Sequence, residues 1–159
     1  MAISGVTPFL WFDDEALAAA ELYVAVFPDS RIISVSHYGE GAPKPAGTPM
    51  VVEFELNGTR MSAINGGPQF PHSAAVSFQV SCDSQEEIDR IWFALIADGG
   101  AEGQCGWCTD RFGVSWQVTP ARMGDLLGGD DPQASQRAMQ AMFGMSRLVI
   151  AELEAARAG

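Results

Sequence analysis

The same order of predicted elements occurs twice along this chain of 159 residues. In the first half, the apolar segment 6–12 predicts a strand, and the Ala- and Leu-rich segment 15–27 predicts a helix. In the second half, the alternating segment 75–82 predicts a strand that an amphipathic helix follows. Asp13 and Asp83 lie 70 positions apart, each between a strand and a helix. Two such units, each leaving one sheet face open, can pair around a shared cavity.

Three further strands complete the first unit, and Asp13 and Asp14 are the predicted N-caps of its helix. The predicted strands cover 31–38, 50–56 and 59–65. Asn57-Gly58 predicts a two-residue hairpin turn between the last two, because both residue types tolerate a positive φ.

The second unit follows the same plan. Ser84 and Glu87 fit a capping box at the start of its helix. Short strands are predicted within 102–109 and at 114–119, with a turn at 110–113 between them. The helix has an apolar face at helical spacing, which consists of Ile88, Ile91, Trp92, Leu95 and Ile96.

A helical tail ends the chain. Helices are predicted at 121–128, 132–145 and 147–157, and the simplest interpretation is that they cover a sheet edge or a dimer interface. The sequence thus predicts one α+β domain over 1–159. Its parts are module one at about 6–67, module two at about 74–120, and the tail at 121–159.

The composition excludes several classes of function. Hydrophobic residues make up 47% and charged residues 18%, as in globular proteins, and the net charge is −11. An acidic chain repels nucleic acid and anionic membranes, so we expect neither as a partner. There is no apolar run long enough for a membrane span and no secretory signal, and three cysteines suggest reduced thiols. We therefore expect a cytoplasmic location.

Several strings carry a resemblance to a known family. They are TPFLWFDD (7–14), FPDSRI (27–32), NGGPQF (65–70), AVSFQVSCDSQEEIDRIW (75–92), DGGAEGQCGW (98–107), DRFGVSWQVTP (110–120) and QRAMQAMFGM (136–145). Together they resemble the PhnB-like proteins over about 6–156. These proteins also carry the name 3-demethylubiquinone-9 3-methyltransferase, and they belong with the glyoxalase, bleomycin-resistance and extradiol-dioxygenase relatives of the vicinal oxygen chelate superfamily.

The resemblance implies a glyoxalase-like fold of paired βαβββ modules that form a cupped mixed sheet, with a homodimer as the usual assembly. Relatives of known chemistry bind a divalent metal through His and Glu. The corresponding places here hold Thr7, Ala63 or Asn65, Ala75 and Gln117. Because Ala and Thr do not replace His, we expect no metal site and no other cofactor, with a divalent metal as the alternative.

Strand alternation indicates which groups line the cup. Ser77 and Gln79 alternate with apolar residues in one strand, as Ser115, Gln117 and Thr119 do in another. These five side chains are the candidate ligand contacts, unless the face is an ordinary half-solvated one. Phe9 and Trp11 are candidates for an apolar wall, and the family strings add Asn65 and Trp107.

Two residues are weak candidates for catalysis. Glu53 alternates with apolar neighbours and would serve as a general base if it points into the cup, although exposed strand glutamates are commoner. His72 follows Pro71 in the loop between modules and would carry protons at the cup mouth, although solvated loop histidines are commoner.

Cys105 and Cys108 form a C-x-x-C motif, which by itself suggests a redox dithiol or half of a zinc site. The motif lies in a strand-rich stretch instead of opening a helix, and no second cysteine pair is present. The pair is therefore interpreted as incidental, with a redox or metal role as the alternative.

The predicted function is that of a PhnB-like small-molecule-binding protein with an unassigned reaction and without the usual metal site. One alternative is a metal-dependent lyase or dioxygenase, and another is a non-catalytic, ligand-sequestering protein of the resistance type. The third is a methyltransferase, as the family name states. No Gly-rich strand-to-helix loop of the kind common at nucleotide-like methyl donors is present.

Overall fold

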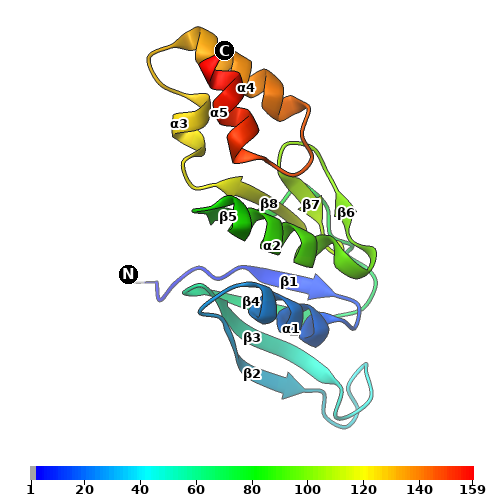
Figure 1. Cartoon of the computed structure of the whole chain (residues 1–159). Helices are drawn as coiled ribbons and strands as arrows, with labels where there is room; N and C mark the ends of the chain where they lie inside the picture. The colour runs from blue at the N-terminus through cyan, green and yellow to red at the C-terminus, as the bar shows by residue number, and fades with distance from the viewer. Residues whose placement is uncertain (1–2) are drawn as a thin grey trace. The chain divides into compact units, whose positions relative to one another are not determined.

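A computed structural model describes residues 3–159 and divides the chain into two units, Met1–His72 and Ser73–Gly159. Each unit contains one four-stranded mixed sheet with helices packed on it (Figure 1). None of the helices within 3–159 has the length and apolar character that crossing a bilayer requires.

The first unit has the element order that the sequence predicts. Its elements are β1 (Phe9–Phe12), α1 (Ala16–Val26), β2 (Arg31–His37), β3 (Pro49–Leu56) and β4 (Thr59–Asn65). The strands lie in the order β1-β4-β3-β2, with β1 parallel to β4 and the other pairs antiparallel. Asn57 and Gly58 form the predicted hairpin turn, with φ angles of 42° and 79°.

Small side chains allow α1 to lie close against its sheet. Ala16, Ala19 and Ala20 are fully buried, and Tyr23 packs its ring 6.2 Å from that of Phe54 on β3. The predicted caps Asp13 and Asp14 are wrong, because the N-cap position is Glu15 and no side chain of its own caps the helix. The helix start is held by a different residue, described below.

The second unit repeats the topology. Its sheet consists of β5 (Ser77–Cys82), β6 (Ala101–Glu102), β7 (Trp107–Thr109) and β8 (Ser115–Pro120). The strand order is β5-β8-β7-β6, with β5 parallel to β8 and the other pairs antiparallel. The first and fourth strands of each unit are therefore parallel neighbours, which confirms the predicted repeat of βαβββ units.

Helix α2 (Gln85–Ile96) follows β5 and packs on one face of this sheet, and a short 3-10 turn, η1 (Ala97–Gly99), ends it. The predicted apolar stripe is confirmed at Ile88, Ile91, Trp92 and Leu95, which are buried, whereas its last member, Ile96, is half-buried. The Ser84 hydroxyl accepts from the Glu87 backbone N–H at 3.2 Å, as predicted. The Glu87 carboxylate accepts from the N–H of Asp83, one residue before the position a capping box would use.

Three helices form the C-terminal tail: α3 (Met123–Leu127), α4 (Pro132–Phe143) and α5 (Ile150–Ala158). They enclose a small core of Leu126, Met145, Leu148 and Leu153. The segment between α4 and α5 is bound to the turn before β7, because the N–H groups of Cys105 and Gly106 donate to the carbonyls of Met145 and Ser146, both at 2.7 Å.

Only glycine fits at position 106, where φ is 84°. A Cβ atom there would lie 2.8 Å from the Val118 carbonyl oxygen and 3.0 Å from the Leu148 side chain. The QCGW string thus marks the place where a turn, β8 and the tail approach one another.

Candidate functional site

Polar side chains from two strands lie on one face of the β5–β8–β7–β6 sheet. Ser77 pairs with Ser115, and Gln79 pairs with Gln117, in the parallel register of β5 and β8. Trp107 of β7 pairs with Gln117 from the other side. Residues that are paired across neighbouring strands lie on the same face of a sheet, and so does every second residue along each strand. The structure therefore brings six predicted residues to one face. We name this surface the amide face: Ser77, Gln79, Trp107, Ser115, Gln117 and Thr119.

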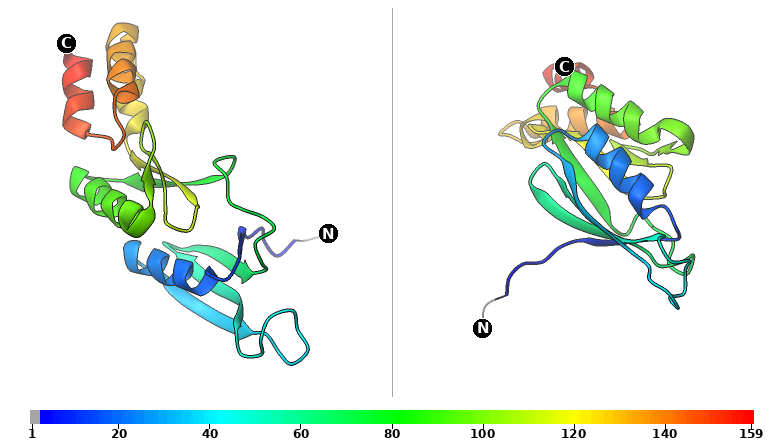
Figure 2. Two further views of the ribbon diagram at one scale, coloured as in Figure 1. Left: turned by 90° about the vertical axis from the view of Figure 1, so that its right-hand side faces the viewer. Right: turned by 90° about the horizontal axis from the view of Figure 1, so that it is seen from below.

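The opposite face of the same sheet is apolar and packs under α2 (Figure 2). Phe78 and Trp116 are register partners there, with ring centroids 5.3 Å apart. Trp116, Val118 and Cys108 are at most 2% exposed. The residue alternation in the sequence therefore corresponds to a core face and an amide face.

Hydrogen bonds hold the side chains of the amide face in place. The Gln117 Nε2 donates to Ser77 Oγ at 2.9 Å, and the Gln79 Nε2 donates to Thr119 Oγ1 at 3.1 Å. The Thr119 hydroxyl donates in turn to the Val80 carbonyl at 3.3 Å. Both glutamines are thereby oriented, with their Oε1 atoms available as acceptors.

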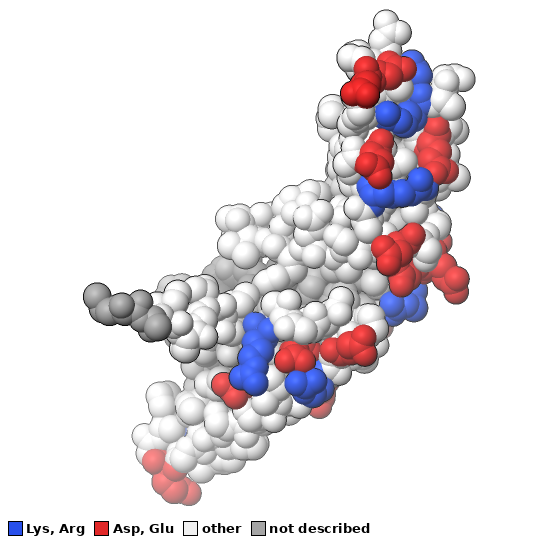
Figure 3. Space-filling view, turned by 90° about the vertical axis from the view of Figure 1, so that its left-hand side faces the viewer, with Lys and Arg blue, Asp and Glu red and all other residues white. Residues whose placement is uncertain are grey.

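The amide face belongs to strands without formal charge. Strands β5, β7 and β8 contain no Asp, Glu, Lys, Arg or His, although the chain as a whole has a net charge of −11. Charged side chains occur elsewhere in mixed clusters, such as the Arg122–Glu154 pair that links α5 to the start of α3. Figure 3 shows such clusters over the C-terminal helices beside wide areas without any charge.

In the first unit, Phe9, Trp11 and Glu53 lie on the sheet face that α1 does not cover, as their register with Ser62 and Ile64 shows. The Trp11 indole donates to the Gly67 carbonyl at 2.7 Å, and its ring meets the Phe70 ring edge-on at 5.1 Å. A Cβ atom on Gly66 would lie 2.2 Å from the Trp11 ring. The part of the NGGPQF string that follows β4, residues 66–70, is therefore a loop that packs around the indole, while Phe9 stays 58% exposed.

The two weak catalytic candidates lie on different faces of the first sheet. Glu53 is exposed and accepts a hydrogen bond from the Ser34 hydroxyl at 2.8 Å. His72 packs edge-on against the ring of Phe12, 4.8 Å between centroids, and Phe12 belongs to the face that α1 covers. The arrangement gives no acid–base pair, so a catalytic role for either residue stays a prediction.

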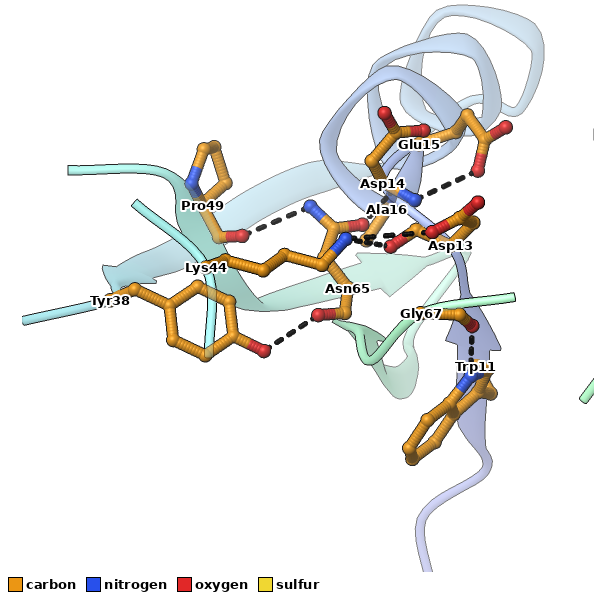
Figure 4. A network of polar contacts seen from close by, with 10 residues as sticks. All are labelled: Trp11, Asp13, Asp14, Glu15, Ala16, Tyr38, Lys44, Pro49, Asn65 and Gly67. Atoms are coloured by element: carbon orange, nitrogen blue, oxygen red, sulfur yellow. Dashed lines mark hydrogen bonds and ion pairs between the residues drawn. The ribbon is translucent and has the colours of Figure 1, made fainter. Parts of the chain in front are cut away.

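Asn65 has a structural role in the first unit (Figure 4). Its Oδ1 accepts from the backbone N–H of Ala16 at 2.7 Å, and its Nδ2 donates to the Pro49 carbonyl at 3.0 Å. The side chain is 1% exposed and caps α1 from 49 positions away. We therefore do not retain Asn65 among the proposed ligand contacts. The sequence gives no local signal for this cap, because Asn65 lies 49 positions from Ala16 along the chain.

Sequence reasoning also missed the contacts of Lys44, the only lysine in the chain. Its ammonium donates to the Asp13 carbonyl and lies 3.6 Å from the Asp13 carboxylate. Beside it, the Tyr38 hydroxyl donates to the Asn65 carbonyl at 2.7 Å. Together these contacts fasten the loop between β2 and β3 to the start of α1 (Figure 4).

The comparisons with known proteins agree with this architecture. The family model described as 3-demethylubiquinone-9 3-methyltransferase matches residues 4–119. The chain belongs to this family. The match ends within β8, so the string at 136–145 and all of the tail from α3 onward lie beyond it.

A solved structure supports the assignment to the 3-demethylubiquinone-9 3-methyltransferase family. It is the PhnB protein of Bacillus cereus, which carries the same family name, and it is 35% identical with a TM-score of 0.69. The similarity covers 74% of this chain and 100% of that chain. No protein in the curated set matches.

More distant solved structures share the fold. A Pseudomonas aeruginosa protein is 23% identical with a TM-score of 0.60, over 74% of this chain and 98% of that chain. The fosfomycin resistance protein FosX of Listeria monocytogenes, solved with Mn(II) and sulfate, is 15% identical with a TM-score of 0.50, over 78% and 95%. These similarities confirm the predicted glyoxalase-like α+β fold.

The places where the resemblance predicts metal ligands hold no His or Glu side chain in this family member. Within residues 3–159, no group of three His, Cys, Asp or Glu side chains is placed to hold a metal ion. Gln117 occupies the place of the expected Glu, and its amide nitrogen is bonded to Ser77. Ala63 is 1% exposed and lies in the register row of Leu10 and Val52, beneath α1.

Cys108 of the C-x-x-C motif does not have the lowered pKa of a reactive thiol. Cys105 lies in the turn before β7, and Cys108 is buried in β7. Burial, followed by the nearby Asp110 and Glu102 carboxylates, raises the pKa of the Cys108 thiol to about 12. Reactive cysteines have a lowered pKa instead, so Cys108 is a packing residue of the core.

Proposed function

We propose that this family member binds a small molecule on the amide face, without a resident metal. The observation that carries the proposal is a row of hydrogen-bonded amide and hydroxyl groups on the sheet face opposite α2. Small-molecule sites combine apolar surface with a few placed polar groups, and Trp107 adds the apolar surface here. No reaction is part of the proposal.

Preorganisation supports binding by this face. Gln side chains have several rotatable bonds, and immobilising them on binding is unfavourable. Here Ser77 already restrains Gln117, and Thr119 already restrains Gln79, before a ligand arrives. A ligand would therefore meet oriented groups.

A ligand screen by thermal shift tests the proposal. We expect at least one small molecule from a metabolite-like library to raise the Tm of the full chain. Because Gln117 is one of the proposed ligand contacts, Gln117→Ala should remove that rise. The matched control is Gln136→Ala on α4, which alters an exposed glutamine away from the amide face. A library without hits, or hits that stabilise Gln117→Ala as strongly as the natural chain, would contradict the proposal.

The metal-dependent alternative is tested by elemental analysis of protein purified without a metal-affinity tag. The proposal expects less than stoichiometric divalent metal, since the strands of the amide face offer no carboxylate or imidazole ligand. One bound divalent ion per chain would contradict it.

The methyltransferase alternative follows from the family name. The turns from β1 to α1 and from β5 to α2 contain Asp13, Asp14 and Asp83, and no glycine-rich loop. We expect no heat of binding in a calorimetric titration with S-adenosylmethionine. Saturable binding would favour the alternative.

We further propose a cytoplasmic homodimer. The three cysteines are free thiols, as expected in a reducing compartment. Strands β1, β2, β5 and β6 end the two sheet orders, and edge strands favour association with a further chain.

A further inference from the structure

We propose that the ligand of the amide face is an uncharged molecule with a carboxamide or lactam group, in which an N–H lies beside a carbonyl. This inference rests on the proposed function and concerns the same face. Its basis is the inventory of hydrogen-bonding atoms that the face leaves available, together with the absence of charge.

Gln117 offers both a donor and an acceptor. A primary amide has two N–H donors and an oxygen that accepts. One Nε2 hydrogen of Gln117 is donated to Ser77, and its Oε1 makes no hydrogen bond within residues 3–159. The side chain thus presents one acceptor and one further donor on the same planar group.

The hydroxyl groups extend this pattern. Ser77 Oγ accepts from Gln117, so the Ser77 hydrogen remains to be donated. Thr119 accepts from Gln79 and donates to the Val80 carbonyl, which uses its hydrogen. Gln79, like Gln117, retains its Oε1 and a second N–H. The available atoms therefore alternate between donors and acceptors, which complements a group that has both.

The charge of the ligand follows from the strands themselves. A carboxylate or phosphate would meet the Gln79 and Gln117 carbonyl oxygens without any cation from β5, β7 or β8. An ammonium group would find no carboxylate there. Desolvating an ion without a charged partner is unfavourable, so a neutral ligand is preferred.

Trp107 accounts for the remaining part of the ligand. It is the register partner of Gln117 on β7 and is half-buried, so its side chain leaves the sheet on the same face as that of Gln117. Aromatic rings pack against flat apolar or aromatic surfaces in offset or edge-on geometry. The ligand class is therefore a carboxamide or lactam attached to a flat apolar ring.

The experiment uses the full ¹⁵N-labelled chain and three benzene derivatives of similar size, namely neutral benzamide, anionic benzoate and cationic benzylamine. The side-chain NH₂ signals of Gln79 and Gln117 are assigned from the spectra of Gln79→Ala and Gln117→Ala. We expect benzamide to shift the Gln117 signal saturably, with an apparent Kd at least tenfold below those of benzoate and benzylamine.

A second variant separates recognition from folding. In Gln117→Glu, the Ser77 hydroxyl can donate to the new carboxylate, so the local hydrogen bond has a replacement. We expect this variant to bind benzamide at least tenfold more weakly, read from the Gln79 signal. Gln136→Glu adds the same charge on α4 and should bind as the natural chain does.

The outcomes distinguish the two proposals. If benzoate or benzylamine shifts the Gln117 signal as strongly as benzamide, the face binds ligands but the proposed class is wrong. The class is also wrong if all three probes fail while a thermal-shift hit shifts the same signals. If no probe and no hit shifts either glutamine, both proposals are contradicted.

Discussion

At the scale of single residues, the Asp110 carboxylate holds the DRFGVSW segment in its conformation. Its Oδ1 accepts from the backbone N–H groups of Phe112 and Val114, at 2.9 and 3.0 Å. Its Oδ2 accepts from the Trp116 indole at 2.8 Å. One carboxylate, 2% exposed, thus shapes the turn before β8 and fixes the largest side chain on the core face of that strand.

We predict that Asp110→Ala lowers the free energy of unfolding by about 3 kcal/mol, because it leaves buried N–H donors without an acceptor. Asp110→Asn keeps one oxygen and should lose less. Urea unfolding measures both changes, and Asp130→Ala in an exposed loop is the control. If Asp110→Ala lowered the free energy of unfolding by less than about 0.5 kcal/mol, as substitutions at ordinary surface sites do, the structural role of Asp110 would be contradicted.

The thiols differ in their expected reactivity. Burial is the largest cause that raises the pKa of Cys82 to about 11, as it does for Cys108. We predict that at pH 8 only the half-buried Cys105 reacts with a thiol reagent in the native chain, whereas all three react after unfolding. Two or three fast-reacting thiols in the native chain would contradict this.

The same shifts have a consequence for stability. Because the folded state holds both thiols neutral, their contribution is present below the ordinary pKa of 9.0. It is lost as the pH rises toward about 11 and about 12. We expect the Tm to fall over this alkaline range, and less so in Cys108→Ala after correction for the lost packing.

At the scale of elements, the helices begin in two different ways. Helices α2 and α4 are capped by the residue directly before them, Ser84 and Asp131, through bonds of 3.2 Å and of 2.9 and 3.1 Å. Helix α1 is capped by Asn65 from β4. A local cap is readable from the sequence, as at Ser84, whereas a cap from a distant strand requires the register of the sheet.

We expect the start of α4 to be sensitive to pH through Asp131. The backbone N–H of Ala134 is the largest cause that holds the pKa of this carboxyl below its ordinary value of 3.8. The stabilisation is therefore present above that value and is lost as the pH falls through the lowered one. We predict that Asp131→Ala lowers the Tm at pH 7, and that the difference narrows at acid pH. Asp131→Asn is the control, because it keeps a capping oxygen without the charge. A Tm difference between the natural chain and Asp131→Ala that stays constant with pH would contradict the capping role of the Asp131 carboxylate.

At the scale of the whole molecule, the repeat of two βαβββ units was predictable, because strand alternation and helical periodicity are local properties. The same alternation predicted that Ser77, Gln79, Ser115, Gln117 and Thr119 share a face. The sequence did not predict the hydrogen bonds between Gln117 and Ser77, since they depend on the parallel register of strands 40 positions apart. The beginning of β5 at Ser77, two residues later than predicted, also follows from that register.

The assembly can be measured directly. The ends of both sheet orders leave edge strands, and Phe9 and Val76 near two of them are 58% and 69% exposed. We predict twice the mass of the chain by light scattering after size exclusion. The mass of a single chain at micromolar concentration would contradict the dimer.

We propose above that the amide face binds an uncharged small molecule. A crystallographic fragment screen with neutral and charged compounds tests it most directly. We expect neutral amide fragments in contact with Gln117 and Ser77, beside Trp107. Fragments bound only elsewhere, or charged fragments alone at Gln117, would contradict it.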